Sequence, residues 1–343
     1  MSKIWINPST KKDKSVLHVM ISSKFLPPFI DFVDTHFGRN NHRYIFLGKE
    51  NYRDGLTPEH KVEFLSTHDG IFATLLDDMR NADKVIIHGL WSVEIDIILS
   101  LNPDIAKKSY WIMWGGDFYF PERQTELRKR AIHNIGNVIT GILGDYELIK
   151  EWYGSTATLY SCFAYPSNVV KIRDCPFSST KRVLVGNSAN PSNNHIEVFE
   201  KIKHLEDIEV ICPLSYGGEE SAKHIIQAGE SIFGNRFIPI LEFMPLEDYN
   251  NMLASVDLAI FNHNRQQGLG NILTLLGYGK KVYIRDNITS WSFFSQKDIK
   301  VFSFNKDKID FNFLEDVKKK NKYIMKDQFS IDKLIQDWSK IFY

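Results

Sequence analysis

The segment from Phe261 to Asn271 has residue types that bind phosphate. An apolar run typical of a buried strand precedes it, and an apolar run typical of a helix start follows it. A glycine-containing turn between strand and helix points backbone N–H groups and the positive end of the helix dipole at one place, where anions bind. Arg265 adds a charged fork of donors. The alternative is an ordinary loop with a solvated arginine. The candidate binding residues are Asn262, Arg265, Gln266, Gln267, Gly268, Leu269, Gly270 and Asn271.

Two other polar turns follow expected strands in the same half of the chain. Gly186, Asn187 and Ser188 form a small-residue turn that allows close backbone approach, and Tyr216 could stack on a base or sugar. The alternatives are that Asn193 or Asn194 caps the next helix and that Tyr216 lies in an ordinary turn. The spacing does not match GxGxxG, so a dinucleotide fingerprint is not indicated.

The first half of the chain has one unusual loop, Trp111–Tyr119. Gly115 and Gly116 free its backbone, and the Asp117 carboxylate is placed to take a proton from a hydroxyl or to bind one. His88 ends the preceding expected strand and would face the same place. The alternatives are that Asp117 caps a helix, that the tryptophans belong to the core and that His88 is structural.

A basic cluster lies beside the aromatic residues Phe118, Tyr119 and Phe120. Such a cluster could contact anionic lipid headgroups, or it could be only a solvated helix face. Its members are Arg123, Arg128, Lys129 and Arg130.

Short apolar runs alternate with segments of helical spacing, which favours βα units and parallel sheets. The expected strands are 16–20, 44–47, 85–88, 110–114 and 137–140 and, after a proline-containing break, 182–185, 209–212, 237–240, 258–261 and 281–284. The expected helices include 71–81, 122–135, 195–202, 220–228 and 331–342. The alternation predicts two α/β domains, with ligands in the cleft that the strand ends of both face.

Composition narrows the functional class. The chain has 343 residues and a formal net charge of zero, so no overall field attracts nucleic acid. No apolar run reaches the roughly 18 residues that span a bilayer, and the N-terminal residues lack a signal-peptide core. The three cysteines have no metal-ligand spacing. The sequence therefore predicts a cytoplasmic protein with reduced thiols and without a metal site.

Several of these segments together resemble a known family, the TDP-4-acetamido-4,6-dideoxygalactose (TDP-Fuc4NAc) transferases of glycosyltransferase family 56. The resemblance runs in order from about His88 to Phe294, and its last motif is the most specific. It differs in an acceptor-side loop at 22–28, in Gly116 and in Asn271, so the acceptor and the donor sugar stay open. The motifs that carry it are 111–119, 184–196, 213–216 and 265–270.

The resemblance implies an α/β fold of GT-B architecture, with two Rossmann-like parallel-sheet domains. It implies an acceptor-binding domain at 1–165, a linker at 166–180, a nucleotide-sugar-binding domain at 181–326 and a helix at 327–343 that packs back towards the first domain. It also implies a TDP-sugar donor, no other cofactor and no metal. Glycosyl transfer to an undecaprenyl-diphosphate-linked oligosaccharide, in enterobacterial common antigen or O-antigen synthesis, would bring the protein peripherally to the inner face of the membrane.

These implications give the candidate residues their roles. Arg265 and the backbone N–H groups of 267–271 would stabilise charge on the leaving diphosphate. Asp117 would orient or deprotonate the acceptor hydroxyl, with Gly115, Gly116 and His88 nearby. Two alternatives stay open: a nucleotide-sugar epimerase, which uses the same fold, and a nucleotide-sugar-binding protein without catalytic activity. The stereochemical course and the oligomeric state do not follow from the sequence.

Overall fold

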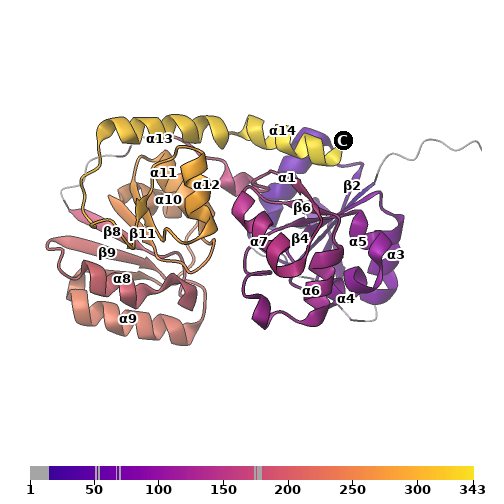
Figure 1. Cartoon of the computed structure of the whole chain (residues 1–343), viewed down its shortest axis with the longest axis horizontal. Coiled ribbons are helices and arrows are strands. Elements are labelled where there is room, and N and C mark those ends of the chain that lie inside the picture. The colour runs from indigo at the N-terminus through magenta and orange to yellow at the C-terminus, as the bar shows by residue number, and fades with distance from the viewer. Residues whose placement is uncertain are drawn as a thin grey trace, which may run out of the picture. The chain divides into compact units, whose positions relative to one another are not determined.

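The computed structural model describes residues 15–343 except 51, 53–54, 67, 69–70, 174 and 176–179. The chain forms two compact units (Figure 1). The first unit consists of the chain up to Gly141, Tyr146–Pro166 and Asp337–Tyr343, and the second consists of Ile142–Asp145 and Ser167–Gln336. The expected linker, 166–180, thus begins at a unit boundary and lies partly outside the described residues.

Seven parallel strands form the sheet of the first unit, in the order β3-β2-β1-β4-β5-β6-β7. All five residues of β1 are buried, as expected for a parallel strand covered on both faces. The sequence patterns predicted the five inner strands, whereas the short edge strands β3 and β7 were not predicted. The strands are β1 (Val16–Met20), β2 (His42–Leu47), β3 (Glu63–Leu65), β4 (Lys84–His88), β5 (Ser109–Ile112), β6 (Asn137–Ile139) and β7 (Thr158–Tyr160).

Helices connect these strands. The expected helix at 71–81 is a π-helical turn at Ile71–Leu75 followed by α3, and the expected helix at 122–135 begins only at α6, where the Thr125 side chain caps it. The last residues of α14, from Asp337 onward, belong to the first unit. The helices are α1 (Leu26–Phe37), α3 (Leu76–Asn81), α4 (Val93–Leu101), α5 (Pro103–Lys107), α6 (Glu126–Asn134), α7 (Leu143–Tyr153) and α14 (Ile331–Phe342).

The second unit has six parallel strands in the order β10-β9-β8-β11-β12-β13. Five of them match expected strands, and only the two-residue β13 was not predicted. The strands are β8 (Lys181–Val185), β9 (Ile208–Pro213), β10 (Phe237–Ile240), β11 (Leu258–Phe261), β12 (Lys281–Ile284) and β13 (Phe302–Ser303). The helices are α8 (His195–Ile202), α9 (Glu219–Phe233), α10 (Leu246–Ser255), α11 (Leu269–Gly277), α12 (Thr289–Gln296) and α13 (Glu315–Gln328).

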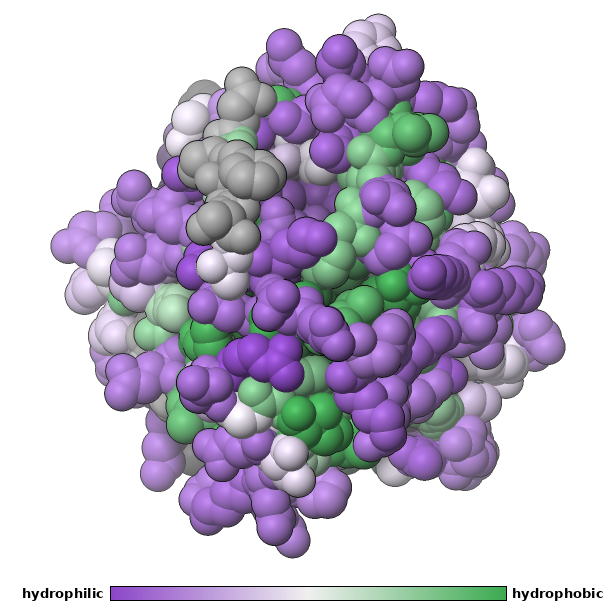
Figure 2. Space-filling view, turned by 90° about the vertical axis from the view of Figure 1, so that its left-hand side faces the viewer, coloured by the Kyte–Doolittle hydropathy of each residue, from purple (hydrophilic) through white to green (hydrophobic). Residues whose placement is uncertain are grey.

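Each unit has its own hydrophobic core. Trp111 and Phe118 are fully buried in the core of the first unit, and Phe199 and Tyr283 in that of the second. The face of the molecule shown in Figure 2 is mostly hydrophilic, with hydrophobic residues in a band flanked by polar ones. Each unit thus buries large aromatic side chains in a core of its own.

The strand order of each sheet reverses at one point. In the first unit this point lies between β1 and β4, and in the second it lies between β8 and β11. Successive connections leave the sheet in opposite directions at such a point, which opens a crevice at the carboxyl ends of the strands. A ligand site is therefore expected at the two loops that follow β8 and β11.

Candidate functional site

The loops after β8 and β11 are bonded to each other. The Asn194 Nδ2 donates to the Asn262 carbonyl at 2.7 Å, and the Asn264 N–H donates to the Ser192 carbonyl at 3.3 Å. Ser192 Oγ also donates to Gln267 Oε1 at 2.6 Å. These bonds join residues about seventy positions apart in the chain into one rigid polar surface.

The residues predicted from the three sequence segments meet on this surface. Gln267 Nε2 donates to Asn187 Oδ1 at 3.3 Å, and Asn187 Nδ2 donates to the Tyr216 hydroxyl at 2.8 Å. Tyr216 follows β9, the strand beside β8, and is half exposed. An aromatic ring is a group that can stack on a base. The structure thus brings together the segments 186–188, 216 and 262–271.

Helix α11 begins at this surface. Its N-cap is Gly268, which has φ +66° and no side chain to cap the helix. The first carbonyl of the helix, that of Gly268, accepts from the Ile272 N–H at 3.1 Å, so the preceding N–H groups of Leu269, Gly270 and Asn271 point out of the helix start. Asn271 is tied back through its side chain, which donates to the Tyr249 hydroxyl at 2.9 Å. The helix start therefore offers donors and a partial positive charge to an anion.

Arg265 lies on the same loop. Its Nη1 donates to the Gln266 carbonyl at 2.9 Å, and the residue is partly exposed. A guanidinium with exposed surface beside a helix start is suited to a phosphate group. The structure therefore places Arg265 and the N-terminus of α11 together, as the sequence segment predicted.

Two further polar residues contribute to this site in ways that the sequence did not predict: Asn193 was considered only as a helix cap, and Arg285 was not singled out. Asn193 is fully buried, and its Oδ1 accepts from the Asn187 N–H at 2.9 Å and contacts His263 Nε2 at 2.8 Å. Arg285 directly follows β12; its Nε donates to Asn262 Oδ1 at 2.6 Å, and its guanidinium pairs with Glu197. Each of these residues lies just beyond a strand or at a helix start, and this position is the signal that could have identified them.

The alternative that Asn193 or Asn194 only caps α8 does not describe the geometry. Asn194 is the N-cap residue, in the left-handed region with φ 50°, but its side chain makes no capping bond. It instead bonds the β11 loop, and the Asn193 side chain lies inside the β8 loop. Both side chains therefore serve to build the site.

Asp117 has a different environment from the one expected of a base. Its carboxylate is fully buried and accepts from the Leu90 N–H at 3.1 Å, the Trp111 Nε1–H at 2.8 Å and the Trp114 N–H at 3.1 Å. Burial raises the pKa of Asp117, and the bonds from Leu90 and Trp111 oppose the rise. The carboxylate has no exposed surface in this conformation, and its role as a base stays a prediction. Asp117 braces the loop that contains Gly115 and Gly116.

His88 is likewise enclosed. It is 1% exposed, with Nε2 3.2 Å from His18 Nδ1 and Nδ1 3.0 Å from the Tyr165 hydroxyl, which also accepts from Trp114 Nε1 at 2.9 Å. Burial lowers the pKa of His88 to about 3, so the ring is neutral near pH 7. His88 thus reaches the Trp114 loop only through Tyr165, and its direct catalytic role stays a prediction.

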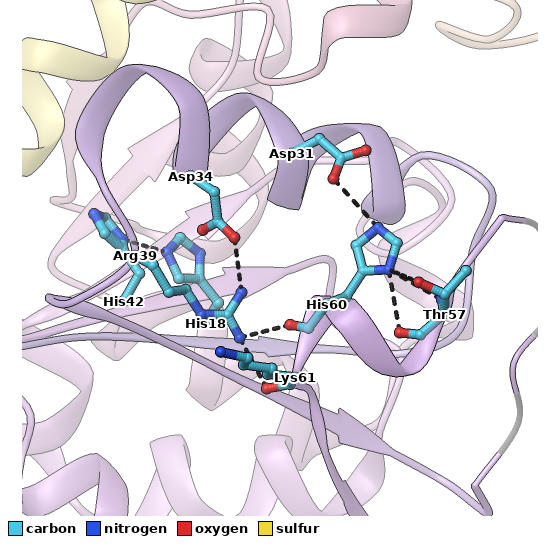
Figure 3. A network of polar contacts seen from close by, with 8 residues as sticks. All are labelled: His18, Asp31, Asp34, Arg39, His42, Thr57, His60 and Lys61. Carbon is cyan, nitrogen blue, oxygen red and sulfur yellow. Dashed lines mark hydrogen bonds and ion pairs between the residues drawn. The ribbon is translucent and has the colours of Figure 1, made fainter.

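The histidine contacts continue to the edge of the first unit. His18 Nε2 lies 3.0 Å from His42 Nδ1, and Figure 3 shows both beside Arg39, which pairs with Asp34. Burial, followed by the charge of Arg39, lowers the pKa of His42 to about 4. A chain of three neutral buried imidazoles therefore runs from His42 through His18 to His88.

The expected basic cluster does not act as one surface. Arg128 is mostly buried; it pairs with Asp96 at 2.6 Å and donates to the Asp117 carbonyl at 2.8 Å. This pairing corrects the expectation that Arg128 contacts lipid, because the buried guanidinium is already bonded. Lys129 pairs with Glu126 on the same helix. Arg123 and Arg130 are exposed and stay candidates for membrane contact.

Among the described residues, no group of three or more histidine, cysteine, aspartate or glutamate side chains is arranged to hold a metal ion. Within the same residues, no helix has both the length and the apolar character needed to cross a membrane.

Comparison with known proteins agrees with the fold and identifies a family. The family model described as 4-alpha-L-fucosyltransferase, glycosyl transferase group 56, matches residues 24–342. HepE (Alr3699) of Anabaena, solved with UDP and glucose, is similar with 13% identity and a TM-score of 0.69 over 96% of this chain and 99% of that one. A glycosyltransferase of Rickettsia africae has 11% identity and a TM-score of 0.67 over 96% and 98%. The UDP-GlcNAc 2-epimerase of Neisseria meningitidis has 13% identity and a TM-score of 0.54 over 95% and 98%. The expected fold class, two Rossmann-like units of the GT-B type, is confirmed.

Proposed function

The chain belongs to glycosyl transferase group 56, and from this premise we propose that it transfers a 4-acetamido-4,6-dideoxyhexose from a TDP-sugar to a lipid-linked oligosaccharide. The family establishes a glycosyltransferase. The finer proposal adds a Fuc4NAc-like donor sugar, an undecaprenyl-diphosphate-linked acceptor, and a place in the synthesis of enterobacterial common antigen or O-antigen.

The observation that carries the donor assignment is the bonded surface at the β8/β11 reversal point. Asn187, Tyr216 and Gln267 converge there from three strands, next to Arg265 and the open start of α11. Cleavage at the anomeric carbon leaves a nucleoside diphosphate, so negative charge grows on the β-phosphate. Fixed N–H donors and a guanidinium stabilise that charge without reorganising, which is the largest single contribution in many enzymes.

This assignment predicts how metals affect the reaction. Because Arg265 and the helix start supply the positive charge, we expect turnover without a divalent ion. Transfer is measured in EDTA and again after magnesium or manganese is added. Full loss in EDTA with recovery on addition of the metal would contradict the proposal.

We assign the acceptor to the first unit and expect it to meet the membrane through Arg123 and Arg130. Each basic residue near an anionic surface contributes about 1 kcal/mol, so two give weak, salt-sensitive attachment. Reversing both charges with glutamate should release the protein from vesicles that contain anionic lipid. Reversing Lys203 and Lys223, which are exposed in the second unit, is the matched control. Equal binding of both double variants would assign the contact elsewhere.

The deciding experiment is a transfer assay with TDP-Fuc4NAc, TDP-glucose and UDP-GlcNAc against undecaprenyl-diphosphate-linked oligosaccharides. The proposal expects a new glycolipid from TDP-Fuc4NAc. Release or epimerisation of the sugar without acceptor would favour the epimerase alternative, and tight nucleotide binding without turnover would favour a binding protein. Transfer from UDP-GlcNAc alone would retain the glycosyltransferase and reject the proposed donor.

A further inference from the structure

His263 is the second residue after β11 and lies inside the proposed donor site. Its side chain is 1% exposed, and both ring nitrogens face oxygen atoms. Nε2 lies 2.8 Å from Asn193 Oδ1, and Nδ1 lies 3.2 Å from the Gln267 carbonyl. A backbone carbonyl only accepts hydrogen bonds, so the identity of the Asn193 atom decides what the ring must donate.

The orientation of the Asn193 amide is fixed by its other bonds. Oδ1 accepts from the Asn187 N–H at 2.9 Å, while Nδ2 donates to the Asn190 carbonyl at 3.0 Å and to Ser188 Oγ at 3.2 Å. Turning the amide over would set two N–H donors against each other and two oxygens against each other. The Asn193 atom that faces His263 is therefore an acceptor.

A neutral imidazole has only one N–H and cannot donate to two acceptors. The neutral ring of His263 donates to one of Asn193 and Gln267 and turns a lone pair towards the other. Only the imidazolium form, with a proton on each nitrogen, satisfies both contacts. Full hydrogen bonding of the His263 ring therefore requires its charged form.

The surroundings disfavour the imidazolium form of His263 in the unliganded protein. Burial, followed by the charge of Arg265, lowers the pKa of His263 to about 3. His195 on α8 also opposes the charge, and the Arg285–Glu197 pair is linked to the same loop through Asn262. A negative charge close to the ring would favour the imidazolium form.

The diphosphate of the proposed donor supplies a negative charge close to the His263 ring. The backbone of Gly268, the N-cap of α11, lies against the ring: a Cβ atom there would be 3.1 Å from His263 Cε1. An anion held at this helix start is therefore a near neighbour of the ring. We propose that His263 takes up a proton when a nucleotide diphosphate-sugar binds, and so adds a second positive charge beside the diphosphate. This inference rests on the proposed function and adds a proton-linked step to donor binding.

Calorimetry with TDP-glucose and UDP-glucose as probes tests the uptake. The phosphates of both sugar nucleotides are diesters that do not titrate between pH 5.5 and 8, so any proton taken up goes to the protein. Titrations in buffers of different ionisation enthalpy measure the uptake directly. A neighbouring opposite charge raises a pKa by up to about three units, so from a starting pKa of about 3 we expect a fraction of a proton per bound nucleotide, which grows as the pH falls towards 5.5 and is small above pH 7. The affinity should fall as the pH rises, by the same fraction of tenfold per pH unit. Binding without uptake at any pH in this range would overturn the inference.

Variants assign the proton to one residue. In His263→Gln the side-chain amide can still donate to Asn193 Oδ1 but cannot titrate, so binding should persist while proton uptake and its pH dependence are lost. His224→Gln, on the exposed side of α9, is the matched control and should keep both. Loss of uptake in His195→Gln and not in His263→Gln would overturn the assignment. His263→Asn, which keeps a donor towards Gln267, serves as a second variant if the first does not fold. Failure of the wild type to bind either probe would instead reject the proposed function.

Discussion

Replacing Asp117 with asparagine separates a structural carboxylate from a catalytic one. The Asp117 carboxylate accepts three N–H groups inside the first unit. An asparagine can keep its oxygen towards Leu90 and Trp111, but its NH₂ group then faces the Trp114 N–H. One buried donor loses its partner, at about 1–3 kcal/mol, and two charge-assisted bonds become neutral, at roughly 0.5–1 kcal/mol each. Relief from burying a charge offsets part of this cost.

The expected net loss is about 2–3 kcal/mol of unfolding free energy for Asp117→Asn. For a unit of this size, that loss corresponds to a melting temperature lower by roughly 5–10 °C. Asp83→Asn is the matched control, because Asp83 accepts one backbone N–H, from Ser15 at 2.7 Å, but is exposed. It should change stability by less than about 0.5 kcal/mol. Urea unfolding and thermal melting of both variants measure these values.

Turnover of the folded variant completes the experiment. If Asp117 only braces the Trp114 loop, transfer measured well below the melting temperature should fall by much less than the 10²–10⁴-fold that loss of a general base causes. A variant that melts like the wild type but loses that much turnover, with unchanged TDP affinity, would refute the reasoning from burial. Asp117 would then act as a base in a conformation other than the one described.

Three other predictions concern the donor site and the buried histidines. Arg265→Ala should weaken TDP binding by about 1.5–3 kcal/mol, as loss of a charge-assisted bond does, whereas the control Lys223→Ala should leave it unchanged. Unchanged TDP affinity of Arg265→Ala in calorimetry would remove Arg265 from the site. Gly186→Ala should cost about 2–5 kcal/mol of stability, because backbone strain at φ +69° adds to a Cβ contact of 2.7 Å with Asn193 and His195. The control Gly154→Ala, with φ +61° and no atom closer than 3.5 Å to the new Cβ, should cost only about 1–2 kcal/mol. Equal losses of the two variants in urea unfolding would contradict this prediction. The first unit should lose stability on acidification, because burial lowers the pKa of three histidines that titrate near 6.5 when unfolded. Their contribution is complete above about pH 6.5 and is lost as the pH falls towards the folded pKa, which is about 4 for His42 and about 3 for His88, at roughly 1.4 kcal/mol per pH unit for each ring. Urea midpoints that stay flat from pH 7 to 5 would refute it; the rings are His18, His42 and His88.

The inner strands and the donor segments could be predicted from the sequence because their signals are local. A strand buried on both faces is a continuous apolar run; β11 has this pattern throughout, and β8 and β9 have it after their first two residues. The two- and three-residue edge strands were not predicted, because they are too short to show a pattern. Helix α6 was predicted to start early because the 3-10 turn Pro121–Arg123 precedes it with similar spacing.

The roles of individual polar side chains could not be predicted, because burial and partners come from distant parts of the chain. The Asp117 carboxylate has the chemistry of an active-site base, but it accepts a hydrogen bond from the N–H of Leu90, almost thirty residues earlier. Arg128 looks like part of a basic cluster until Asp96 of α4 pairs with it. His263 lies within the predicted phosphate-binding segment, but nothing in the sequence assigns it a role, and only the fold brings Asn193 to its ring.

The sequence by itself determined the two-unit α/β fold, the family and the segment that we propose for the donor phosphate. Apolar periodicity and a glycine-containing turn before a helix are properties of adjacent residues, so they can be recognised without knowledge of the fold. Only the tertiary structure decided which polar groups are free to react and which are already bonded. That decision depends on distances between residues far apart in the chain, such as Asn187 and Gln267, and these distances exist only after the sheet has set its strand order.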